Sequence, residues 1–229
     1  MGFDTATQDT AVCAQRDGGV LYEALLGLSE DGSPGHTTRL LGEIEAAAAA
    51  AGGWSEVEAI AVGLGPGSFT GLRVGIATAR ALAASLCLPV RGACTLDALA
   101  HGLGATLAAA CRPRLAIIDA RRGEVFVALH ASSGERLWEP WVGTPAELSE
   151  RAQALPEPPL AAGSGALRFR DELASCGVEV AAGGDVHRVA ARDVCALAVE
   201  GGAKQLSPIY LRPPDAERWH ERDTSQRTE

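Results

Sequence analysis

The sequence predicts an α/β protein of two similar halves, each a mixed sheet flanked by helices. Three observations support this fold class. The order of expected strands and helices in residues 1–104 recurs in residues 105–213. In each half hairpin strands precede helical crossovers, which places antiparallel and parallel pairs in one sheet. The chain has 229 residues, 47% of them apolar, enough to bury a substantial core.

The first half predicts five strands and three helices. The turn at Arg16–Gly19 separates two strands of a hairpin, and Gly52-Gly53 ends a helix that Pro34 and Gly35 open. Expected strands cover residues 1–4, 10–15, 20–28, 57–64 and 89–91, and expected helices cover 34–51, 68–85 and 95–103.

The second half predicts the same order with little sequence identity to the first, so the repeat is architectural. Thr144 is expected to cap a helix that begins at Pro145. Expected strands cover residues 114–118, 124–131, 136–142 and 160–162, a helix follows the glycine turn at 163–165, the last helix covers 186–200, residues 208–212 are extended, and 214–229 form a polar, mobile tail.

Composition and charge argue against a nucleic-acid-binding protein, a disulfide-rich protein and a membrane protein. The net charge of −9 provides little of the phosphate attraction that drives non-specific nucleic-acid binding. The nearest approach to a basic patch is Arg112, Arg114, Arg121 and Arg122. The six cysteines form no CxxC pair, which indicates free, buried thiols. The acidic start and the interrupted apolar stretches predict a soluble, cytoplasmic protein with no signal peptide and no membrane span.

The most informative segment is Gly63–Ala83, GLGPGSFTGLRVGIATARALA, which predicts a strand, a glycine loop and a helix. Gly65-Pro66-Gly67 favours a tight turn, and Ser68 or Thr70 offers a hydroxyl to cap the helix. The free amides at such a helix start attract anions. The segment therefore has the general form of a phosphate-binding loop.

The helix of this segment has small residues on one face. Gly71, Gly75, Ala79 and Ala83 recur at a spacing of four. Because glycine inside a helix costs about 1 kcal/mol relative to alanine, this face predicts that another backbone or a ligand presses close. On another face, Arg73 and Arg80 are available for an acidic partner or a phosphate.

Two familiar phosphate-binding fingerprints are not met. A P-loop requires lysine after its last glycine, and Leu72 stands at that position. The dinucleotide pattern GxGxxG requires a third glycine, which neither Ser68 nor Thr70 supplies. The residues alone leave two interpretations open, a phosphate-binding loop or a tight structural turn.

The same segment resembles the signature of the TsaB family, also called YeaZ. Three shorter segments, at residues 3–7, 119–126 and 208–213, resemble the start of that family, the start of its second half and its C-terminal end. The resemblances occur in order and span nearly the whole chain. The first is long and specific, and the others corroborate it.

The resemblance implies a fold and a set of vestigial site residues. The family is similar to the actin, Hsp70 and sugar-kinase (ASKHA) superfamily, built from two RNase H-like halves. In active members, the acidic turn after each first strand holds metal and phosphate. Asp4 and Asp119 occupy those turns here, and Gly163-Ser164-Gly165 is a candidate remnant of an adenosine site. The alternative is that these turns only close hairpins.

The chain lacks the residues of a catalytic centre. The similar TsaD-type transferase holds a metal with paired histidines on one helix, but no histidine here has another four positions later; His36 is followed by Leu40. Ser68 lacks the GxSxG elbow, and no cysteine has an adjacent histidine. We therefore expect no catalytic residue, no metal site and only an inactive likeness to M22 peptidases.

A narrow apolar stripe on the first long helix is the candidate interface. By its pattern alone such a stripe is most often intramolecular core. The resemblance implies instead that this helix pairs TsaB with itself or with a TsaD-like subunit. The residues of the candidate interface are His36, Leu40, Leu41, Ile44 and Ala48. The candidate contact residues of the family loop and helix are Gly65, Pro66, Gly67, Ser68, Thr70, Gly71 and Arg73.

Two functional hypotheses follow. In the first, the chain is a non-catalytic subunit that acts with a TsaD-like transferase and a TsaE-like ATPase to place threonylcarbamoyl on the adenosine next to the tRNA anticodon. ATP and a divalent metal are then expected on the partners, with no cofactor on this chain, a possible homodimer and only indirect contact with tRNA. In the second, the chain is a stand-alone ATP-binding phosphotransferase or ATPase.

Overall fold

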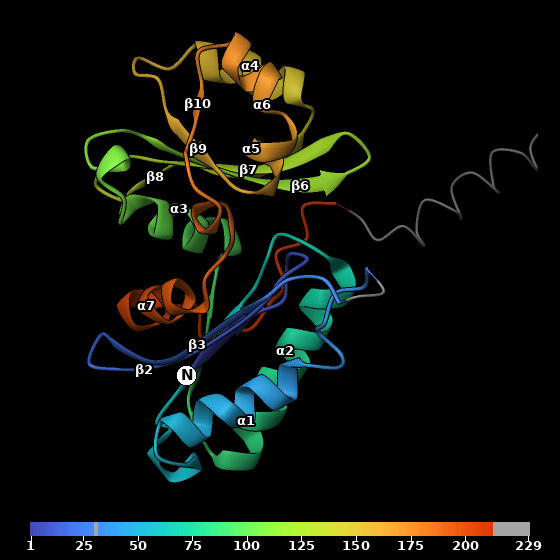
Figure 1. The fold of residues 1–229 in the computed structure, drawn as a ribbon, viewed down its shortest axis with the longest axis vertical. Coiled ribbons are helices and arrows are strands. Elements are labelled where there is room, and N and C mark those ends of the chain that lie inside the picture. The colour runs from blue at the N-terminus through green and yellow to red at the C-terminus, as the bar shows by residue number, and fades with distance from the viewer. Residues whose placement is uncertain (30–31, 213–229) are drawn as a thin grey trace, which may run out of the picture.

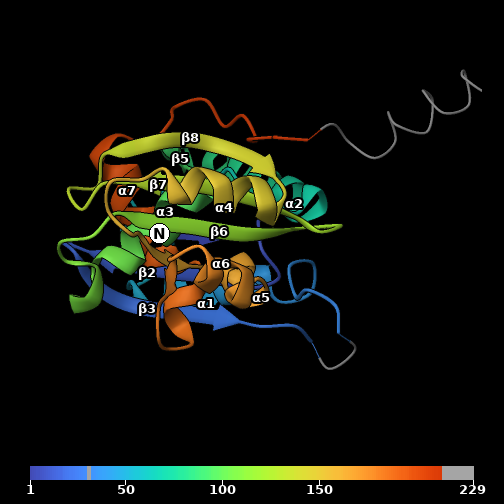
Figure 2. The same cartoon turned by 90° about the horizontal axis from the view of Figure 1, so that it is seen from above.

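The computed structural model describes residues 1–29 and 32–212, arranged as two five-stranded sheets with helices outside and between them (Figure 1). The predicted tail at 214–229 lies outside the described residues. Seen from above, the two sheets and their helices overlap as stacked layers (Figure 2). The α/β class with two similar halves is confirmed.

The first sheet has the order β3-β2-β1-β4-β5. Its central strand β1 pairs antiparallel with β2, where Phe3 lies opposite Val12, and parallel with β4, where Phe3 lies beside Val62. A parallel pair requires a crossover connection, and the helix between β2–β3 and β4 supplies it. The strands are β1 Gly2–Asp4, β2 Thr10–Arg16, β3 Gly19–Leu26, β4 Ile60–Gly63 and β5 Val90–Ala93.

The second sheet repeats this arrangement in the order β10-β9-β6-β7-β8. Here β6 is central, antiparallel to β7 and parallel to β9. Strand β10 was not predicted, because two residues carry too little alternation to be recognised. The strands are β6 Arg114–Arg121, β7 Glu124–His130, β8 Arg136–Gly143, β9 Leu160–Ala162 and β10 Glu179–Val180.

Helices form three of the five layers (Figure 1). Helices α1 and α2 cover the outer face of the first sheet, α3 and α7 lie between the two sheets, and α4, α5 and α6 cover the outer face of the second. The helices are α1 Leu40–Ala50, α2 Phe69–Leu86, α3 Thr95–Gly104, α4 Pro145–Gln153, α5 Ser164–Arg168, α6 Arg170–Ser175 and α7 Ala191–Gly201. Short 3-10 turns occur at Trp54–Glu56, Leu107–Ala109 and Asp185–His187.

Small residues explain why the layers lie close together. The central core between the sheets contains many alanines from α3 and α7, together with Leu99, Leu103 and Cys195. Separate outer cores join α1 and α2 to the first sheet and α4 and α6 to the second. The Ala-rich, aromatic-poor composition therefore fills three thin layers of core rather than one bulky one.

Helix α7 differs from its predicted place. The sequence assigned it to the second half, residues 105–213, but it packs against β1, β2, β4 and β5 of the first sheet. The side chains on its buried face are small, so α7 packs closely on β1, where Gly2 leaves room for the Cys195 thiol. The buried apolar residues of α7 are Ala191, Val194, Cys195 and Ala198. Farther along, the Ile209 amide donates to the Leu64 carbonyl at 2.7 Å.

Two helix starts were predicted too early. Helix α1 begins at Leu40 rather than at Pro34, because the intervening residues form turns in which the His36 ring bonds to the β1–β2 turn. Helix α7 begins at Ala191 rather than at Val186, because His187 and Arg188 point to other partners. In both places side-chain hydrogen bonds to distant residues override the local preference for helix.

The six cysteines are all unpaired. Cys13, Cys94 and Cys195 are buried, as predicted for the whole set, whereas Cys87 and Cys111 are exposed, contrary to that prediction. Among residues 1–29 and 32–212, none of the helices combines the length and the apolar character needed to cross a bilayer.

Candidate functional site

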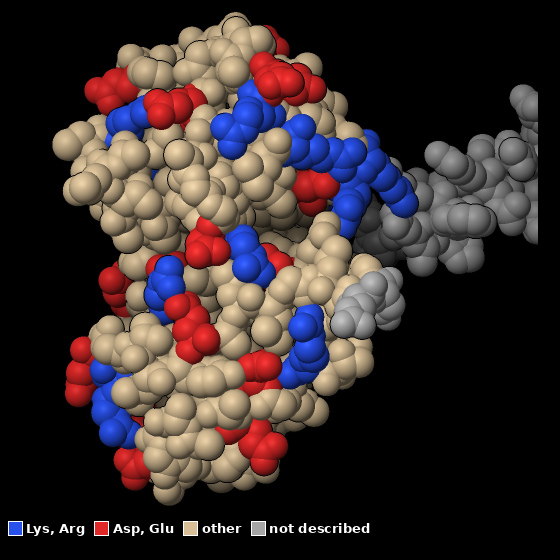
Figure 3. Space-filling model, viewed as in Figure 1, with Lys and Arg blue, Asp and Glu red and all other residues tan. Residues whose placement is uncertain are grey.

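A cleft of about 990 Å³ separates the two halves and is lined by five of the fourteen predicted site residues, Gly67, Ser68, Thr70, Arg73 and Asp119. Its walls come from the β1–β2 turn, the start of α2, the β6–β7 turn and the start of α5, which the topology brings to one end of both central strands. In the space-filling view the surface is hollowed between the halves, with basic side chains at the edge of the upper half (Figure 3). Thr7, Asp9, Ser68, Thr70, Arg73 and Asp119 are among the lining residues.

The glycine face of α2 packs on the β1–β2 turn. A Cβ atom added at Gly71 would lie 1.9 Å from the Thr5 carbonyl oxygen, and one at Gly75 would lie 2.4 Å from Thr5 Oγ1. The Thr5 hydroxyl donates to the Gly71 carbonyl at 2.7 Å. The predicted close neighbour of this face is therefore the chain's own backbone.

The glycine loop joins the same contact. A Cβ atom at Gly67 would lie 2.1 Å from the Ala6 carbonyl oxygen, which accepts from the Ser68 amide at 2.7 Å. Ser68, one of the two predicted hydroxyls, caps α2 by accepting from the Gly71 amide at 3.2 Å. Gly65 and Pro66 are buried, so only the later part of the loop faces the cleft.

Asp4 lies beneath the cleft rather than in it. The residue is 1% exposed. Oδ1 accepts from the Ala6 amide at 2.7 Å, and Oδ2 accepts from the Thr95 hydroxyl at 2.8 Å. Thr95 Oγ1 in turn accepts from the Gly65 amide at 3.1 Å. Burial raises the pKa of Asp4, because water no longer stabilises its charged form. This carboxyl group holds the β1–β2 turn, α3 and the glycine loop together.

Asp119 occupies the equivalent place in the second half and does line the cleft. Its Oδ1 accepts from the Arg121 amide at 2.9 Å, and its Oδ2 forms an ion pair with Arg168 at 2.8 Å. The Asp119 amide donates to Ser164 Oγ at 3.1 Å, which ties the turn to α5. Both carboxylate oxygens already have partners within the chain.

The glycine turn before α5 is held by a buried histidine. Gly163 has a φ of +116°, and a Cβ atom there would lie 2.0 Å from the Ile117 carbonyl oxygen. His187 Nδ1 accepts from the Gly163 amide at 3.1 Å, while Nε2 donates to the Ala181 carbonyl at 3.0 Å. Burial lowers the pKa of His187. This neutral ring fixes the turn that the sequence identified as a remnant adenosine site.

Arginines give the cleft a positive character despite the acidic chain. Arg73, Arg121, Arg122, Arg188 and Arg212 all line it. The predicted basic patch is therefore divided, because Arg121 and Arg122 lie in the cleft while Arg112 and Arg114 lie at the other end of β6.

Two contacts order the mouth of the cleft. Arg188 binds Asp9 through two hydrogen bonds of 2.9 and 2.8 Å, which joins the second half to the β1–β2 turn. The Arg73 guanidinium lies 3.8 Å from the centre of the Phe69 ring, and that ring contacts Tyr210. Sequence reasoning missed Asp9, Thr95, His187 and Arg188, because none belongs to a motif and their partners are distant in the sequence.

The predicted interface stripe is mostly core, which corrects that prediction. Leu40, Ile44 and Ala48 are each 1% exposed because α1 packs them against β2 and β3, and His36 is 6% exposed. Leu41 alone of the five is exposed, at 64%. The stripe therefore fills the first outer core and leaves one of its members available to a partner.

His36 has a structural task near the cleft. Its Nδ1 accepts from the Thr10 hydroxyl at 2.9 Å, and its Nε2 donates to the Thr7 carbonyl at 3.1 Å. Burial lowers the pKa of His36, so the ring is neutral at physiological pH. It positions the turn that carries Thr7 and Asp9 into the cleft.

No group of three or more His, Cys, Asp or Glu side chains in the described part of the chain converges as metal ligands do. The four described histidines, His36, His101, His130 and His187, instead bond to carboxylates, hydroxyls or backbone groups. What the arrangement offers chemically is a positively charged cleft with both turn acids engaged.

Comparison with known proteins gives consistent matches. Residues 28–209 match the family model described as "TsaD: tRNA N6-adenosine threonylcarbamoyltransferase". The chain is 33% identical to the tRNA threonylcarbamoyladenosine biosynthesis protein TsaB of Escherichia coli, over 93% of this chain and 94% of that protein. An uncharacterized protein of Mycobacterium tuberculosis is 37% identical over 79% and 77% of the two chains. The solved structure of YeaZ from Pseudomonas aeruginosa matches with a TM-score of 0.73 and 28% identity, covering 92% and 98% of the chains.

Proposed function

Because the chain belongs to the TsaB (YeaZ) family, we propose that it takes part in tRNA threonylcarbamoyladenosine biosynthesis. TsaB of Escherichia coli, which carries this function in its name, matches over 93% of the chain, so the proposal rests on both halves rather than on one motif. The match of residues 28–209 to the model of a tRNA N6-adenosine threonylcarbamoyltransferase family supports a role in the same modification.

We further propose that the chain is a non-catalytic subunit, which acts with a TsaD-like transferase and a TsaE-like ATPase. The observation that carries this is the state of the two acidic turns. Asp4 is buried under Thr95 and Ala6, and Asp119 is bound by Arg168 and the Arg121 amide. An acid that holds a metal and phosphate needs free oxygen atoms facing the ligand. Asp4 is buried and does not line the cleft, and the charge of Asp119 is paired with Arg168, so neither turn presents a free carboxylate to the cleft.

The partner contact is proposed to lie on the outer surface of α1. Leu41 projects there, and its exposed side chain offers apolar area that another chain could bury. Helix α1 packs its other side on the sheet, so a partner bound there would meet a rigid surface. This assignment replaces the five-residue stripe with Leu41 and its exposed neighbours.

Reconstitution tests both proposals. The purified chain is mixed with a TsaD-like subunit, a TsaE-like subunit, ATP, threonylcarbamoyl precursors and tRNA, and modified adenosine is measured. We expect modification to require this chain. Leu41→Glu should abolish the effect while the variant stays folded, whereas Leu107→Glu, at a 97% exposed position on the 3-10 turn after α3, should not. Equal modification without the chain would refute the subunit role, and full activity of Leu41→Glu would refute the α1 contact alone.

A second candidate is a stand-alone ATP-binding phosphotransferase or ATPase. The observation in its favour is the arginine-lined cleft, large enough at about 990 Å³ for a nucleotide. Calorimetry of the isolated chain with ATP and magnesium decides between the two. Binding at micromolar ATP that Asp119→Ala removes would favour this candidate, and the absence of heat at millimolar ATP would exclude it.

A further inference from the structure

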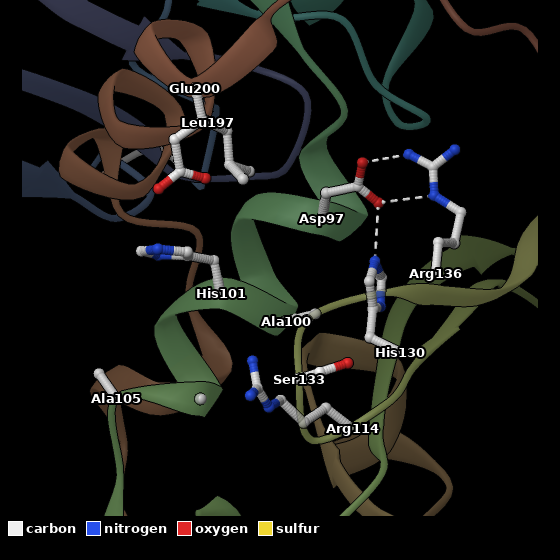
Figure 4. Close-up of a pocket in the computed structure, with 12 residues that line it drawn as sticks. Asp97, Ala100, His101, Ala105, Arg114, His130, Ser133, Arg136, Leu197 and Glu200 are labelled. Atoms are coloured by element: carbon white, nitrogen blue, oxygen red, sulfur yellow. Dashed lines mark hydrogen bonds and ion pairs between the residues drawn. The ribbon is translucent and has the colours of Figure 1, made fainter.

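A second cavity, of about 570 Å³, opens at the opposite end of β6 from the cleft. Its walls are α3, α7 and the hairpin between β7 and β8, and it shares no lining residue with the cleft. Figure 4 shows side chains from all of these elements around it. Nothing in the proposed function uses this cavity, yet it contains several charged groups.

Arg114, at the start of β6, is the central charged group. Its Nη2 donates to the Ser132 carbonyl, but its Nε is buried without a hydrogen-bond partner. In the described part of the chain no carboxylate forms an ion pair with Arg114, whereas Arg136 in the same cavity pairs with Asp97 and Glu139. Burial lowers the pKa of Arg114, which reflects a cation that has lost water without gaining a counter-ion.

The end of α3 provides the space for this guanidinium. A Cβ atom added at Gly104 would lie 2.1 Å from Arg114 Nη1 and 2.5 Å from Cζ, so only glycine permits the observed position. A cation is favourable at a helix C-terminus, which helps to hold Arg114 there. The contact with Gly104 fixes the side chain while its buried Nε stays without an acceptor.

His101 adds a second donor on the same wall. Its Nδ1 donates to Asp193 Oδ1 at 2.8 Å, a contact that raises the pKa of His101 and orients the ring. The ring is 40% exposed, and no hydrogen bond engages its Nε2 in the described part of the chain. Asp97, one turn earlier on α3, cannot neutralise these cations, because its carboxylate is engaged by His130 at 2.9 Å and by Arg136.

We propose that this cavity binds a small ligand through a carboxylate or phosphate group, with Arg114 as the main ligand-binding residue and His101 as a second donor. A guanidinium group matches the planar oxygens of a carboxylate and the oxygens of a phosphate, and an unpaired one in a cavity selects an anion. Ala100, Ala105 and Leu197 line the rest of the wall and accommodate a short organic body. Glu200 at the cavity opposes an anion, so its charge limits the affinity.

Amide chemical shifts of the full chain test this proposal. Sodium acetate and inorganic phosphate are titrated separately at pH 7 and constant ionic strength. We expect saturable shifts at Gly104, Ser133 and Gly134, and none at the cleft glycines Gly67 and Gly184. Tighter binding of acetate identifies an organic acid as the ligand class, and tighter binding of phosphate identifies a phosphate ester.

Four variants make the test specific. Arg114→Gln should weaken binding at least tenfold. Gly104→Ala, which keeps the charge but displaces the guanidinium, should weaken it as well, so the result does not depend on one variant remaining folded. Glu200→Gln should strengthen binding several-fold by removing the opposing charge. Arg16→Gln, at an exposed ion pair with Glu56 outside both cavities, should change nothing.

Three results would overturn the proposal. They are the absence of saturable shifts with both anions, shifts that persist in folded Arg114→Gln, and shifts confined to the cleft glycines. Each of these leaves the reconstitution experiment unaffected, because that experiment tests the need for the chain and for Leu41, which does not line this cavity.

Discussion

The two halves share one topology but treat the acid after their first strand differently. In the first half, Asp4 is 1% exposed and bonded to Ala6 and Thr95. In the second half, the Asp119 side chain is 11% exposed, lines the cleft and pairs with Arg168. The same position of the same fold is sealed under the glycine loop in one half and remains open to the cleft in the other.

The difference teaches how a fold can keep the framework of a ligand site without keeping the site. In the first half the glycines, whose usual use is to let a ligand approach, let α2 approach the β1–β2 turn instead. In the second half the acid still faces the cleft, but a neighbouring arginine neutralises it. Packing buries the acid of the first turn, and an ion pair neutralises the acid of the second. The two arrangements therefore predict different losses of stability when the turns are mutated.

The largest effect is expected at the glycine contact. Gly71→Ala would place a Cβ atom 1.9 Å from a backbone carbonyl, so we expect a loss of about 3 kcal/mol in the free energy of unfolding. Gly165→Ala in the second half should cost less, about 1 kcal/mol, because its closest contact is the Ile117 Cγ2 methyl at 2.6 Å, which can move. Urea unfolding followed by circular dichroism measures both.

Gly42 provides the control for this comparison. It lies in α1 with no atom within 4 Å of an added Cβ, so Gly42→Ala should stabilise the protein by about 0.5 to 1 kcal/mol through helix propensity. If Gly71→Ala stabilised the protein to a similar extent, the first turn would not be closed by packing.

Replacing the two turn acids, Asp4 and Asp119, should cause the next largest losses of stability. Asp4→Ala leaves the buried Ala6 amide and Thr95 hydroxyl without an acceptor, and we expect a loss of about 2 to 3 kcal/mol. Asp119→Ala should cost about 1 kcal/mol, because Arg168 is half exposed and water can replace part of the lost contact. Equal costs in urea unfolding would contradict the distinction between a sealed and an open turn.

The pH dependence of stability sharpens the same contrast. The pKa of Asp4 is raised in the folded state, so the folded protein holds this proton at pH values where the unfolded chain has lost it. The stability from this proton is complete below the unfolded value of 3.8 and is lost as the pH rises through the folded pKa. Unfolding midpoints from pH 3.5 to 8 should show this loss in Asp119→Asn but not in Asp4→Asn.

Local patterns predicted the elements well where the signal lies within a few residues. Thr144 caps α4 in a capping box with Glu147, as its position before Pro145 indicated. Glycine turns correctly marked where the hairpin strands meet. The repeated order of strands correctly indicated two similar sheets. These features depend on periodicity and turn chemistry, which a single sequence displays directly.

The site was less predictable because its contacts are not local. Asp9 and Arg188 are separated by 179 positions, and no pattern in either segment points to the other. The α1 stripe is a related case. Its spacing predicts an apolar face, but the spacing does not indicate whether that face packs on the chain's own sheet or on a partner. Only the packing of α1 on β2 and β3 decides that Leu40 is core and Leu41 is surface.

The smallest expected effect concerns the Asp9–Arg188 pair, which connects the two halves across the cleft. Both side chains are partly exposed, at 20% and 29%, so solvent screens the attraction, and we expect a coupling of about 0.5 kcal/mol. A double-mutant cycle with Asp9→Asn and Arg188→Gln, measured by urea unfolding, isolates this term. The Arg192–Glu23 pair, whose arginine is 49% exposed, serves as the matched control and should couple more weakly. If the coupling at Asp9–Arg188 were absent, the β1–β2 turn would be held by contacts of the first half, through Asp4, His36 and α2, and closure of the first turn would be independent of the second half.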